Sequence, residues 1–315
     1  MTNSKAVILG AGHVGSHCAR ALAEREIFHE IVLVDIVLGK AEAQAADIAD
    51  AAGWPDRAVR VRSGRYEDCA DADLTVVAIG KPREKGQTRL DLLDDSVRMA
   101  RGLTDTLRPI GVGGLVVSIT NPCDIIAGCI REGLGLPRFR CFGTGTLLDT
   151  LRLRRVLSEQ TGLARGTVQA WVLGEHGDSS MIPFSAAFIG GVPALQVPGV
   201  DPADALERTH RIGMDIIEGK GSTEFGIGLA LAGLAASILR DSGDVLPLSV
   251  LLQGEYGLDG IQAGVPCVVG REGIRRIVEW PLTEEEREAL RRSADVLARY
   301  TARAAALDRT EDNRP

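Results

Sequence analysis

The sequence has no apolar segment long enough to cross a membrane. Its apolar runs fall well short of the roughly 18 consecutive residues that a transmembrane helix needs. Residues 1–5 lead directly into a strand-like segment, without the apolar stretch of a signal peptide. We therefore expect no membrane partner and a cytoplasmic location.

Long basic runs are also missing. The 315-residue chain has 36 Lys and Arg against 43 Asp and Glu, and its net charge is −7. A protein that binds a polyanion needs a basic face to neutralise the phosphates. We therefore expect no nucleic-acid partner, although a small anionic ligand needs only a few local cations.

The cysteines form no disulfide or metal motif. There is no CxxC pair and no Cys/His cluster at metal-ligand spacing. The six cysteines are Cys18, Cys69, Cys123, Cys129, Cys141 and Cys267. We expect reduced thiols that pack as small hydrophobic side chains, and no metal site.

What the first half does contain is an alternation of strand-like and helical patterns. Near-continuous apolar runs are typical of strands buried on both faces of a parallel sheet. Such runs occupy residues 6–10, 30–35, 74–80 and 115–120, and helical patterns occupy residues 13–26, 40–51 and 91–107. The alternation predicts an α/β fold with a doubly wound parallel sheet of the Rossmann type.

The pattern changes near residue 145. The later segments are a helix over 146–161, a strand over 168–174, a Gly/Pro-rich stretch over 190–202, and a C-terminal helix over 282–300 that opens with Thr283 and Glu286 in capping-box spacing. Single cores stop growing at about 250–300 residues, so two lobes are expected. We predict a Rossmann domain at residues 1–145 and a mixed α+β catalytic domain at residues 146–315.

The stretch GAGHVG, residues 10–15, follows a strand and begins a helix. Glycines there allow a tight turn and a close approach of the backbone to a pyrophosphate, whose charge then faces the helix N-terminus. Asp35 ends the next strand, where a carboxylate accepts the adenosine-ribose hydroxyls and repels a 2′-phosphate. The pattern predicts an NAD site, and the alternative is a Gly-rich turn with a surface aspartate. The predicted contacts are Gly10, Gly12, His13, Val14, Gly15, Asp35 and Gly80, with no chemical role for His13.

The stretch GEHGDSS, residues 174–180, contains the candidate catalytic residue His176. Hydride transfer to a carbonyl leaves an oxygen that needs a proton, which an imidazolium supplies near neutral pH. Asp149, in LLDTLRLR, is the candidate carboxylate that orients the ring. Arg152 lies on the same helical face three residues later and can grip a substrate carboxylate with two hydrogen bonds. A core histidine and a solvated arginine are the alternatives.

The five motifs GAGHVG, SITNPCD, LLDTLRLR, GEHGDSS and IIEGKGSTEFGIG resemble those of the L-lactate/malate dehydrogenase family. They occur in the same order and at similar spacing over nearly the whole chain. The resemblance implies an NAD-dependent L-2-hydroxy acid dehydrogenase, with a small 2-oxo or 2-hydroxy acid as substrate. It also implies a homodimer or homotetramer.

The resemblance assigns further roles. Arg89 matches the arginine of a mobile lid that polarises the substrate carbonyl, and the lid corresponds to GKPREKGQTRLDL, residues 80–92. Asn121 matches a residue that holds both the nicotinamide and the substrate oxygen. Thr223 would line the pocket beside the substrate side chain.

Arg83 stands where the family sets substrate choice. Malate dehydrogenases similar to this sequence have Arg there, whereas lactate dehydrogenases have Gln. A cation on the lid pairs with the second carboxylate of oxaloacetate, which favours malate. Glu84 follows directly, and GEHGDSS and KGSTEFG resemble lactate dehydrogenases, so lactate or a bulkier 2-hydroxy acid stays open.

A regulatory site is also a matter of resemblance. Lactate dehydrogenases that are activated by fructose 1,6-bisphosphate present an arginine and a histidine to the sugar phosphate. Arg154 matches the first, but Gln169 occupies the position of the second. We expect weak or absent activation.

Two other classes of function compete with a dehydrogenase. NAD-dependent glycosidases use a divalent metal held by Cys and His, and only Cys123 is a candidate to approach His176. A non-catalytic NAD sensor would keep the fold without the reacting side chains, all of which are present here.

Overall fold

The computed structural model describes residues 4–52, 59–80 and 89–307. Within them, nine strands form one sheet in the order β12-β11-β10-β6-β5-β4-β1-β2-β3. The parallel part comprises β1 (Lys5–Leu9), β2 (Glu30–Val34), β3 (Arg60–Ser63), β4 (Leu74–Val77), β5 (Leu115–Ser118) and β6 (Cys141–Gly143). The antiparallel strands β10 (Val245–Gln253), β11 (Asp259–Gly270) and β12 (Gly273–Ile277) continue it. The sheet therefore runs across residue 145.

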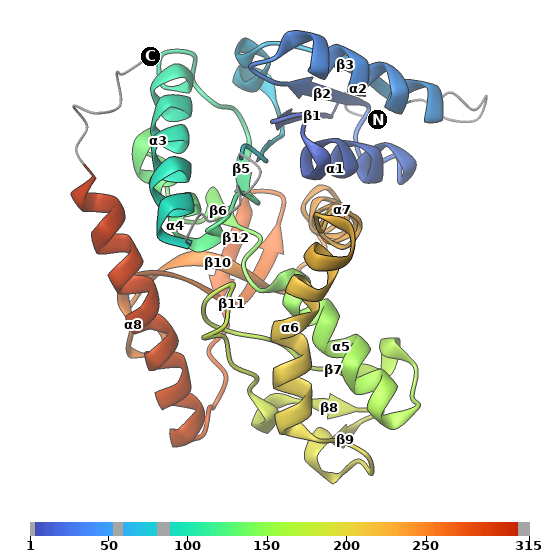
Figure 1. The fold of residues 1–315 in the computed structure, drawn as a ribbon, viewed down its shortest axis with the longest axis vertical. Helices are drawn as coiled ribbons and strands as arrows, with labels where there is room; N and C mark the ends of the chain where they lie inside the picture. The colour runs from blue at the N-terminus through green and yellow to red at the C-terminus, as the bar shows by residue number, and fades with distance from the viewer. Residues whose placement is uncertain (1–3, 53–58, 81–88, 308–315) are drawn as a thin grey trace.

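Helices pack against the sheet in two groups (Figure 1). The first group comprises α1 (His13–Glu24), α2 (Leu38–Ala51) and α7 (Phe225–Arg240), and α1 contacts both of the others. The second comprises α3 (Arg89–Leu107), α4 (Cys123–Leu134) and α8 (Glu284–Ala306). Strands β1, β4 and β5 are buried along their whole length, as their apolar runs predict. The expected doubly wound parallel sheet is confirmed.

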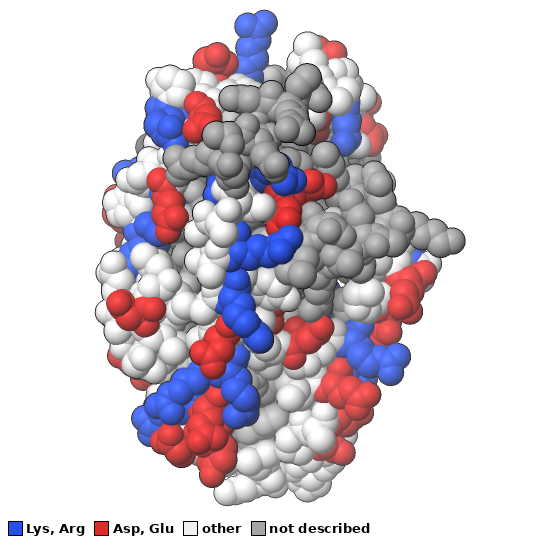
Figure 2. Space-filling model, turned by 60° about the vertical axis from the view of Figure 1, so that its left-hand side comes forward, with Lys and Arg blue, Asp and Glu red and all other residues white. Residues whose placement is uncertain are grey.

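The capping box at the start of α8 is present. The Thr283 hydroxyl accepts the Glu286 backbone N–H, and the Glu286 carboxylate accepts the Thr283 N–H. Figure 2 shows the face that carries α8 and α3, where basic and acidic side chains are interspersed. Arg303 of α8 pairs there with Asp94 of α3.

The remaining elements form a smaller layer below the sheet (Figure 1). They are α5 (Leu147–Thr161), α6 (Pro202–Lys220), β7 (Val168–Gln169), β8 (Phe188–Ile189) and β9 (Val192–Pro193). Their buried apolar side chains form a second core cluster. α5 is the first element of this layer, and it follows directly after β6 of the large sheet.

The prediction of a strand over residues 168–174 is wrong in extent. Only β7 is a strand, and two isolated bridges follow, between Leu173 and Met181 and between Gly174 and Gly264 of β11. Gly174 has a φ of 94°, which turns the chain toward β11. The apolar run reflects burial against two different elements rather than one continuous strand.

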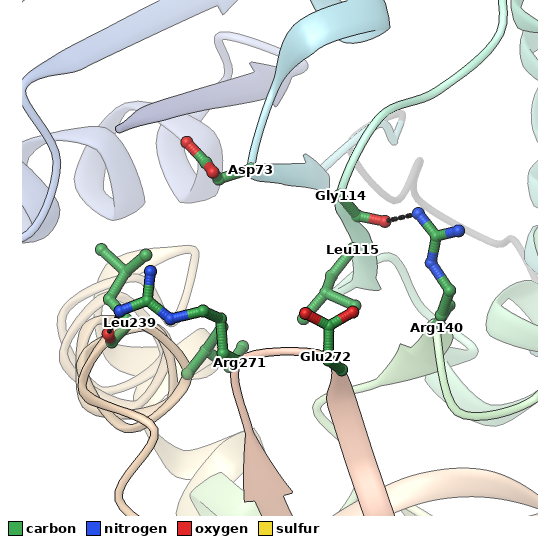
Figure 3. Close-up of a pocket in the computed structure, with 8 residues that line it drawn as sticks. Asp73, Gly114, Leu115, Arg140, Leu239, Arg271 and Glu272 are labelled. Atoms are coloured by element: carbon green, nitrogen blue, oxygen red, sulfur yellow. Dashed lines mark hydrogen bonds between the residues drawn. The ribbon is translucent and has the colours of Figure 1, made fainter. Parts of the chain in front are cut away.

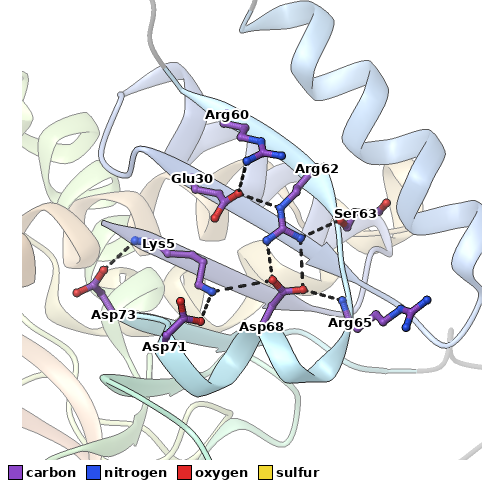
Figure 4. A network of polar contacts seen from close by, with 9 residues as sticks. All are labelled: Lys5, Glu30, Arg60, Arg62, Ser63, Arg65, Asp68, Asp71 and Asp73. Carbon is purple, nitrogen blue, oxygen red and sulfur yellow. Dashed lines mark hydrogen bonds and ion pairs between the residues drawn. The ribbon is translucent and has the colours of Figure 1, made fainter. Parts of the chain in front are cut away.

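Strands β3 and β6 have no signal in the sequence pattern. β6 is only three residues long. β3 is an edge strand with the sequence RVRS; Val61 packs against the core, and the arginines form ion pairs (Figure 4). Arg62 of β3 contacts Glu30 of β2 at 2.8 Å and Asp68 of the 3-10 helix η1 (Tyr66–Asp71) at 2.6 Å. Lys5 of β1 also lies 3.9 Å from Asp68.

Among the described residues no helix is long and apolar enough to span a membrane. Five of the six cysteines are buried and Cys129 is half-buried, all as free thiols. Burial raises the pKa of Cys123 to about 12.

Candidate active site

His176 and Asp149 form a hydrogen-bonded pair. Nδ1 of His176 lies 2.6 Å from Oδ2 of Asp149, and the two side chains are 22% and 11% exposed. Asp149 is the third residue of α5, and His176 lies in the turn that follows Gly174. Because Nδ1 is engaged, Nε2 is the ring nitrogen left for a ligand.

The charges around this pair favour the imidazolium. Asp149 raises the pKa of His176, against the lowering effect of burial. Burial would raise the pKa of Asp149, but His176 and Arg152 together hold it below its usual value. An imidazolium held in this orientation is chemically suited to donate a proton.

Arg152 lies one helical turn after Asp149. Its Nη1 donates to Oδ1 of Asp149 at 2.9 Å. One oxygen of the Asp149 carboxylate therefore contacts Arg152 and the other contacts His176. The Arg152 side chain is only 12% exposed. On α6, a Cβ added at Gly213 would lie 3.3 Å from Nη1. A guanidinium held in this way is suited to bidentate contact with a carboxylate.

The backbone of the glycine loop, residues 10–15, packs against the residue that follows β4. Gly10 has a φ of 101°, and a Cβ there would lie 2.5 Å from the Ala78 carbonyl oxygen. A Cβ on Gly15 would lie 1.8 Å from the Gly10 carbonyl oxygen. A Cβ added at Gly12, by contrast, would meet only Lys40 Nζ within 4 Å among the described residues, at 3.8 Å. The loop therefore leaves open backbone at the start of α1, as a pyrophosphate requires.

Asp35 lies beside this loop. Its Oδ2 accepts the Ala11 N–H at 2.8 Å and its Oδ1 accepts the Val37 N–H at 2.9 Å. Lys40 Nζ lies 3.8 Å from Oδ2. The Asp35 carboxylate can accept ribose hydroxyls, and the open backbone at Gly12 leaves room for a pyrophosphate, so the residues present fit NAD.

The glycine loop and His176 lie at the same edge of the sheet. The loop follows β1, and Asp124, which accepts the His176 N–H at 2.8 Å, is the second residue of α4 after β5. Only β4 separates β1 from β5, and neighbouring strands lie about 4.8 Å apart. Thr120 also donates to the Ile79 carbonyl at 2.8 Å, which joins the segments after β5 and β4. A single strand, β4, therefore separates the glycine loop from the segment that holds the turn of His176.

The other predicted site residues lie around the glycine loop or between helices. His13 is exposed at the first position of α1, Val14 is half-buried beside it, and Gly80 is exposed after β4. Asn121 is exposed before α4, and Thr223 is half-buried between α6 and α7. In the described part of the chain, no hydrogen bond or ion pair joins Asn121 or Thr223 to His176, Asp149 or Arg152.

The lid and its cations are not described in full. Arg83 lies outside the described residues, as does most of the lid at residues 81–88. Arg89 begins α3, and only its backbone is described.

Asp124 was missed by the sequence reasoning, although it belongs to the SITNPCD motif. It is 2% exposed and holds the backbone of His176. The available signal was an acidic residue at the start of a helix after a buried strand, at the same sheet edge as the glycine loop.

A cavity of about 190 Å³ lies at the opposite edge of the sheet (Figure 3). Asp73 and Gly114 precede β4 and β5, and Arg271 lies in the turn between β11 and β12. Arg140 donates to the Gly114 carbonyl at 2.6 Å. Asp73, Gly114 and Arg140 lie at the amino ends of the parallel strands, so the cavity is separate from the candidate active site.

A Rossmann sheet with an open glycine loop, next to a buried His–Asp pair and a fixed arginine, defines a nicotinamide-dependent dehydrogenase. Comparisons with known proteins identify which kind. Residues 4–143 match the NAD binding domain of the lactate/malate dehydrogenases, and residues 146–307 match the alpha/beta C-terminal domain of the same family. The chain belongs to the lactate/malate dehydrogenase family and is an NAD-dependent 2-hydroxy acid dehydrogenase.

Individual relatives match this chain over almost its full length. The chain is 39% identical over 305 residues to an L-lactate dehydrogenase of Fusobacterium nucleatum, with 94% of this chain and 95% of the relative covered. It is 35% identical over 302 residues to that of Mesoplasma florum, with 94% and 95% covered. The structure of a minor L-lactate dehydrogenase from Enterococcus mundtii has a TM-score of 0.93 at 33% identity, with 98% of this chain and 100% of that chain covered. The family, fold class and cofactor expected from the sequence are confirmed.

Proposed function

We propose that His176 is the proton donor and Arg152 the carboxylate clamp in the reduction of a short 2-oxo acid. The observation that carries this proposal is the 2.6 Å contact between His176 and Asp149, with Arg152 on the other oxygen of the same carboxylate. When bound, NADH supplies the hydride to the carbonyl carbon.

In this proposal Arg152 holds the C1 carboxylate, and Nε2 of His176 gives its proton to the substrate oxygen. Asp149 keeps the ring oriented and stabilises its charged form before the transfer. Arg89 polarises the carbonyl, Asn121 holds the substrate oxygen and the nicotinamide, and Thr223 lines the pocket. Charges act most strongly in such a site when water is excluded.

The substrate that we propose is oxaloacetate, with malate as the product, because Arg83 on the lid offers a second cation. Pyruvate is the second candidate, since the named relatives are L-lactate dehydrogenases. NADH oxidation with purified protein and a panel of 2-oxo acids tests both. Oxaloacetate turnover above pyruvate turnover supports malate, and the reverse order contradicts it.

His176→Gln tests the chemistry for whichever substrate is used. Removal of the proton donor is expected to lower kcat by a factor on the order of 10²–10⁴. NADH binding, followed by its fluorescence, is expected to persist because the glycine loop is untouched. Full activity of this variant would contradict the assignment.

We also propose that the chain forms a homo-oligomer. Leu151 of α5 is 39% exposed, and Leu229 and Phe225 of α7 are 49% and 59% exposed. A separate apolar face on β8 and β9 includes Phe188 and Val192, at 36% and 43%. Exposed apolar faces of this kind are typical of subunit contacts. Light scattering that gives a mass of 33.5 kDa at micromolar concentration would contradict the proposal.

A further inference from the structure

Side chains close the loop between α6 and α7, residues 221–224. Nζ of Lys220, the last residue of α6, donates to the Ser222 carbonyl at 2.9 Å and also pairs with the Glu224 carboxylate. The Ser222 hydroxyl donates to Oε2 of Glu224 at 2.7 Å. Thr223 lies between Ser222 and Glu224, so these contacts hold the chain on both sides of it.

The main chain does not hold the loop in this way. Gly221 has a φ of 93°, and its N–H donates to the Ile217 carbonyl at 2.8 Å, where α6 ends. The N–H groups of residues 222–224 donate to no acceptor in the part of the chain that the structure describes. The conformation of the loop therefore depends on the contacts of Lys220 and Ser222 with Glu224.

Glu224 does not cap the helix that follows it. It occupies the N-cap position of α7, where a side-chain oxygen commonly accepts a backbone N–H of the first turn. Among the described residues, its side chain accepts no such N–H and turns back to Lys220 and Ser222. Burial raises the pKa of Glu224, but the hydrogen bonds from Lys220 and Ser222 hold it below its usual value. This charged side chain, only 8% exposed, therefore serves the loop rather than the helix.

The loop is joined to the helices that carry the glycine loop and Asp149. α7 begins directly after Glu224 and packs against both α1 and α5. A Cβ added at Gly226 would lie 2.9 Å from Cδ1 of Leu148, the residue before Asp149. Phe225 contacts the His17 ring of α1 edge-on, with 4.9 Å between the ring centres. A change in the loop therefore acts next to the candidate active site.

We propose that Glu224, through Lys220 and Ser222, is a positioning residue for Thr223 and so limits the length of the substrate side chain that the enzyme accepts. A loop that is held on both sides does not yield to a longer side chain, and one extra methylene in a closely packed pocket already changes specificity measurably. This inference rests on the proposed role of Thr223 in the substrate pocket.

Glu224→Gln tests the proposal because it keeps the size of the side chain and removes its charge. kcat/KM is measured for pyruvate and for 2-oxohexanoate, which share the reacting group and differ in side-chain length. We expect the ratio of 2-oxohexanoate to pyruvate to rise by at least about threefold, mainly through KM, with NADH affinity unchanged. An unchanged ratio in the folded variant overturns the proposal.

A matched control lies on the same helix. Asp215 of α6 is 56% exposed and pairs with Arg211 at 3.7 Å, also four residues apart. Asp215→Asn is expected to leave the ratio unchanged, and an equal rise in this control overturns the proposal.

The partners of Glu224 supply further variants. Lys220→Met is expected to raise the ratio as Glu224→Gln does, and the double variant to raise it no further, because the two residues act as one pair. Additive effects overturn the proposal. If Glu224→Gln does not fold, Ser222→Ala takes its place, with a smaller rise expected, and no rise in it overturns the proposal.

A second readout needs no turnover. Threonine methyl groups are followed by NMR relaxation, and Thr223→Ser identifies the Thr223 signal. In Glu224→Gln the order parameter of this methyl group is expected to fall, and in Asp215→Asn to stay the same. An unchanged order parameter in Glu224→Gln overturns the proposal. If no 2-oxo acid is reduced at all, the proposed function fails, but the relaxation data still decide whether Glu224 positions Thr223.

Discussion

Nδ1 of His176 lies 2.6 Å from Oδ2 of Asp149, although the two residues are 27 positions apart in the chain. The contact fixes the ring, leaves Nε2 free and favours the charged imidazole.

Asp149→Asn is expected to lower the pH at which 2-oxo acid reduction is lost. Asp149 raises the pKa of His176, so wild type keeps the imidazolium to a higher pH and loses it as the pH rises through that value. The amide removes the charge, and kcat at pH 7.5 is expected to fall by a factor on the order of 10²–10⁴. A pH profile of kcat/KM measures this shift, and an unchanged profile would contradict the role of Asp149.

Arg152→Lys is expected to raise KM for the 2-oxo acid more than it lowers kcat. Lysine keeps the charge but loses the planar pair of donors, and the loss of one charge-assisted hydrogen bond of about 1.5–3 kcal/mol corresponds to roughly a 10- to 150-fold weaker clamp. Arg155→Lys, on the same helix and 38% exposed, is the matched control. Equal effects of the two variants would show that Arg152 does not touch the substrate.

Arg83→Gln is expected to shift preference from oxaloacetate toward pyruvate. In the proposed function the lid cation pairs with the second carboxylate of oxaloacetate, so its removal should cost about 1–3 kcal/mol in kcat/KM for that substrate. The ratio of the two kcat/KM values measures the shift. Lys85→Gln removes a different cation from the same segment, and an equal change in that control would mean that Arg83 has no specific role.

Fructose 1,6-bisphosphate is expected to leave the apparent KM unchanged. Arg154 Nε donates to the Ala170 carbonyl at 3.2 Å, and its guanidinium lies 5.4 Å from the centre of the Trp171 ring. Gln169, at the expected histidine position, adds no positive charge. Steady-state kinetics with and without the sugar bisphosphate check this, and a large drop in KM would overturn it.

Arg62→Met is expected to destabilise the protein by about 1–2 kcal/mol at neutral pH. Burial would raise the pKa of Asp68, but Arg62 holds it below its usual value (Figure 4). A lowered pKa gives stability that is present above the pKa of the unfolded chain and lost as the pH falls through that of the folded protein.

The difference in urea midpoint between Arg62→Met and wild type should therefore be large at pH 7 and shrink below about pH 4. Arg60→Met is the matched control, because Arg60 is 73% exposed and contacts Glu30 at 3.4 Å. A deficit for Arg62→Met that stays constant with pH would contradict the role of Asp68.

Much of the fold was predictable because local patterns report burial. Strands β1, β2, β4 and β5 are apolar on both faces, and the capping box at Thr283 marks the start of α8. The polar edge strand β3 was not predictable, because Val61 is its one apolar residue and ion pairs of Arg62 add to its packing. The segment 168–174 was predicted as one strand because it is apolar, but its residues are buried against several different elements.

The sequence by itself determined the alternation of strands and helices, the glycine loop with its acid Asp35, and the spacing that pairs Asp149 with Arg152 on one helix. Only the tertiary structure decided what surrounds His176, including the contact with Asp124, 52 residues away. The reason is physical. Periodicity reports which segments are buried, whereas a contact between distant side chains depends on the order of the strands and on where their ends meet.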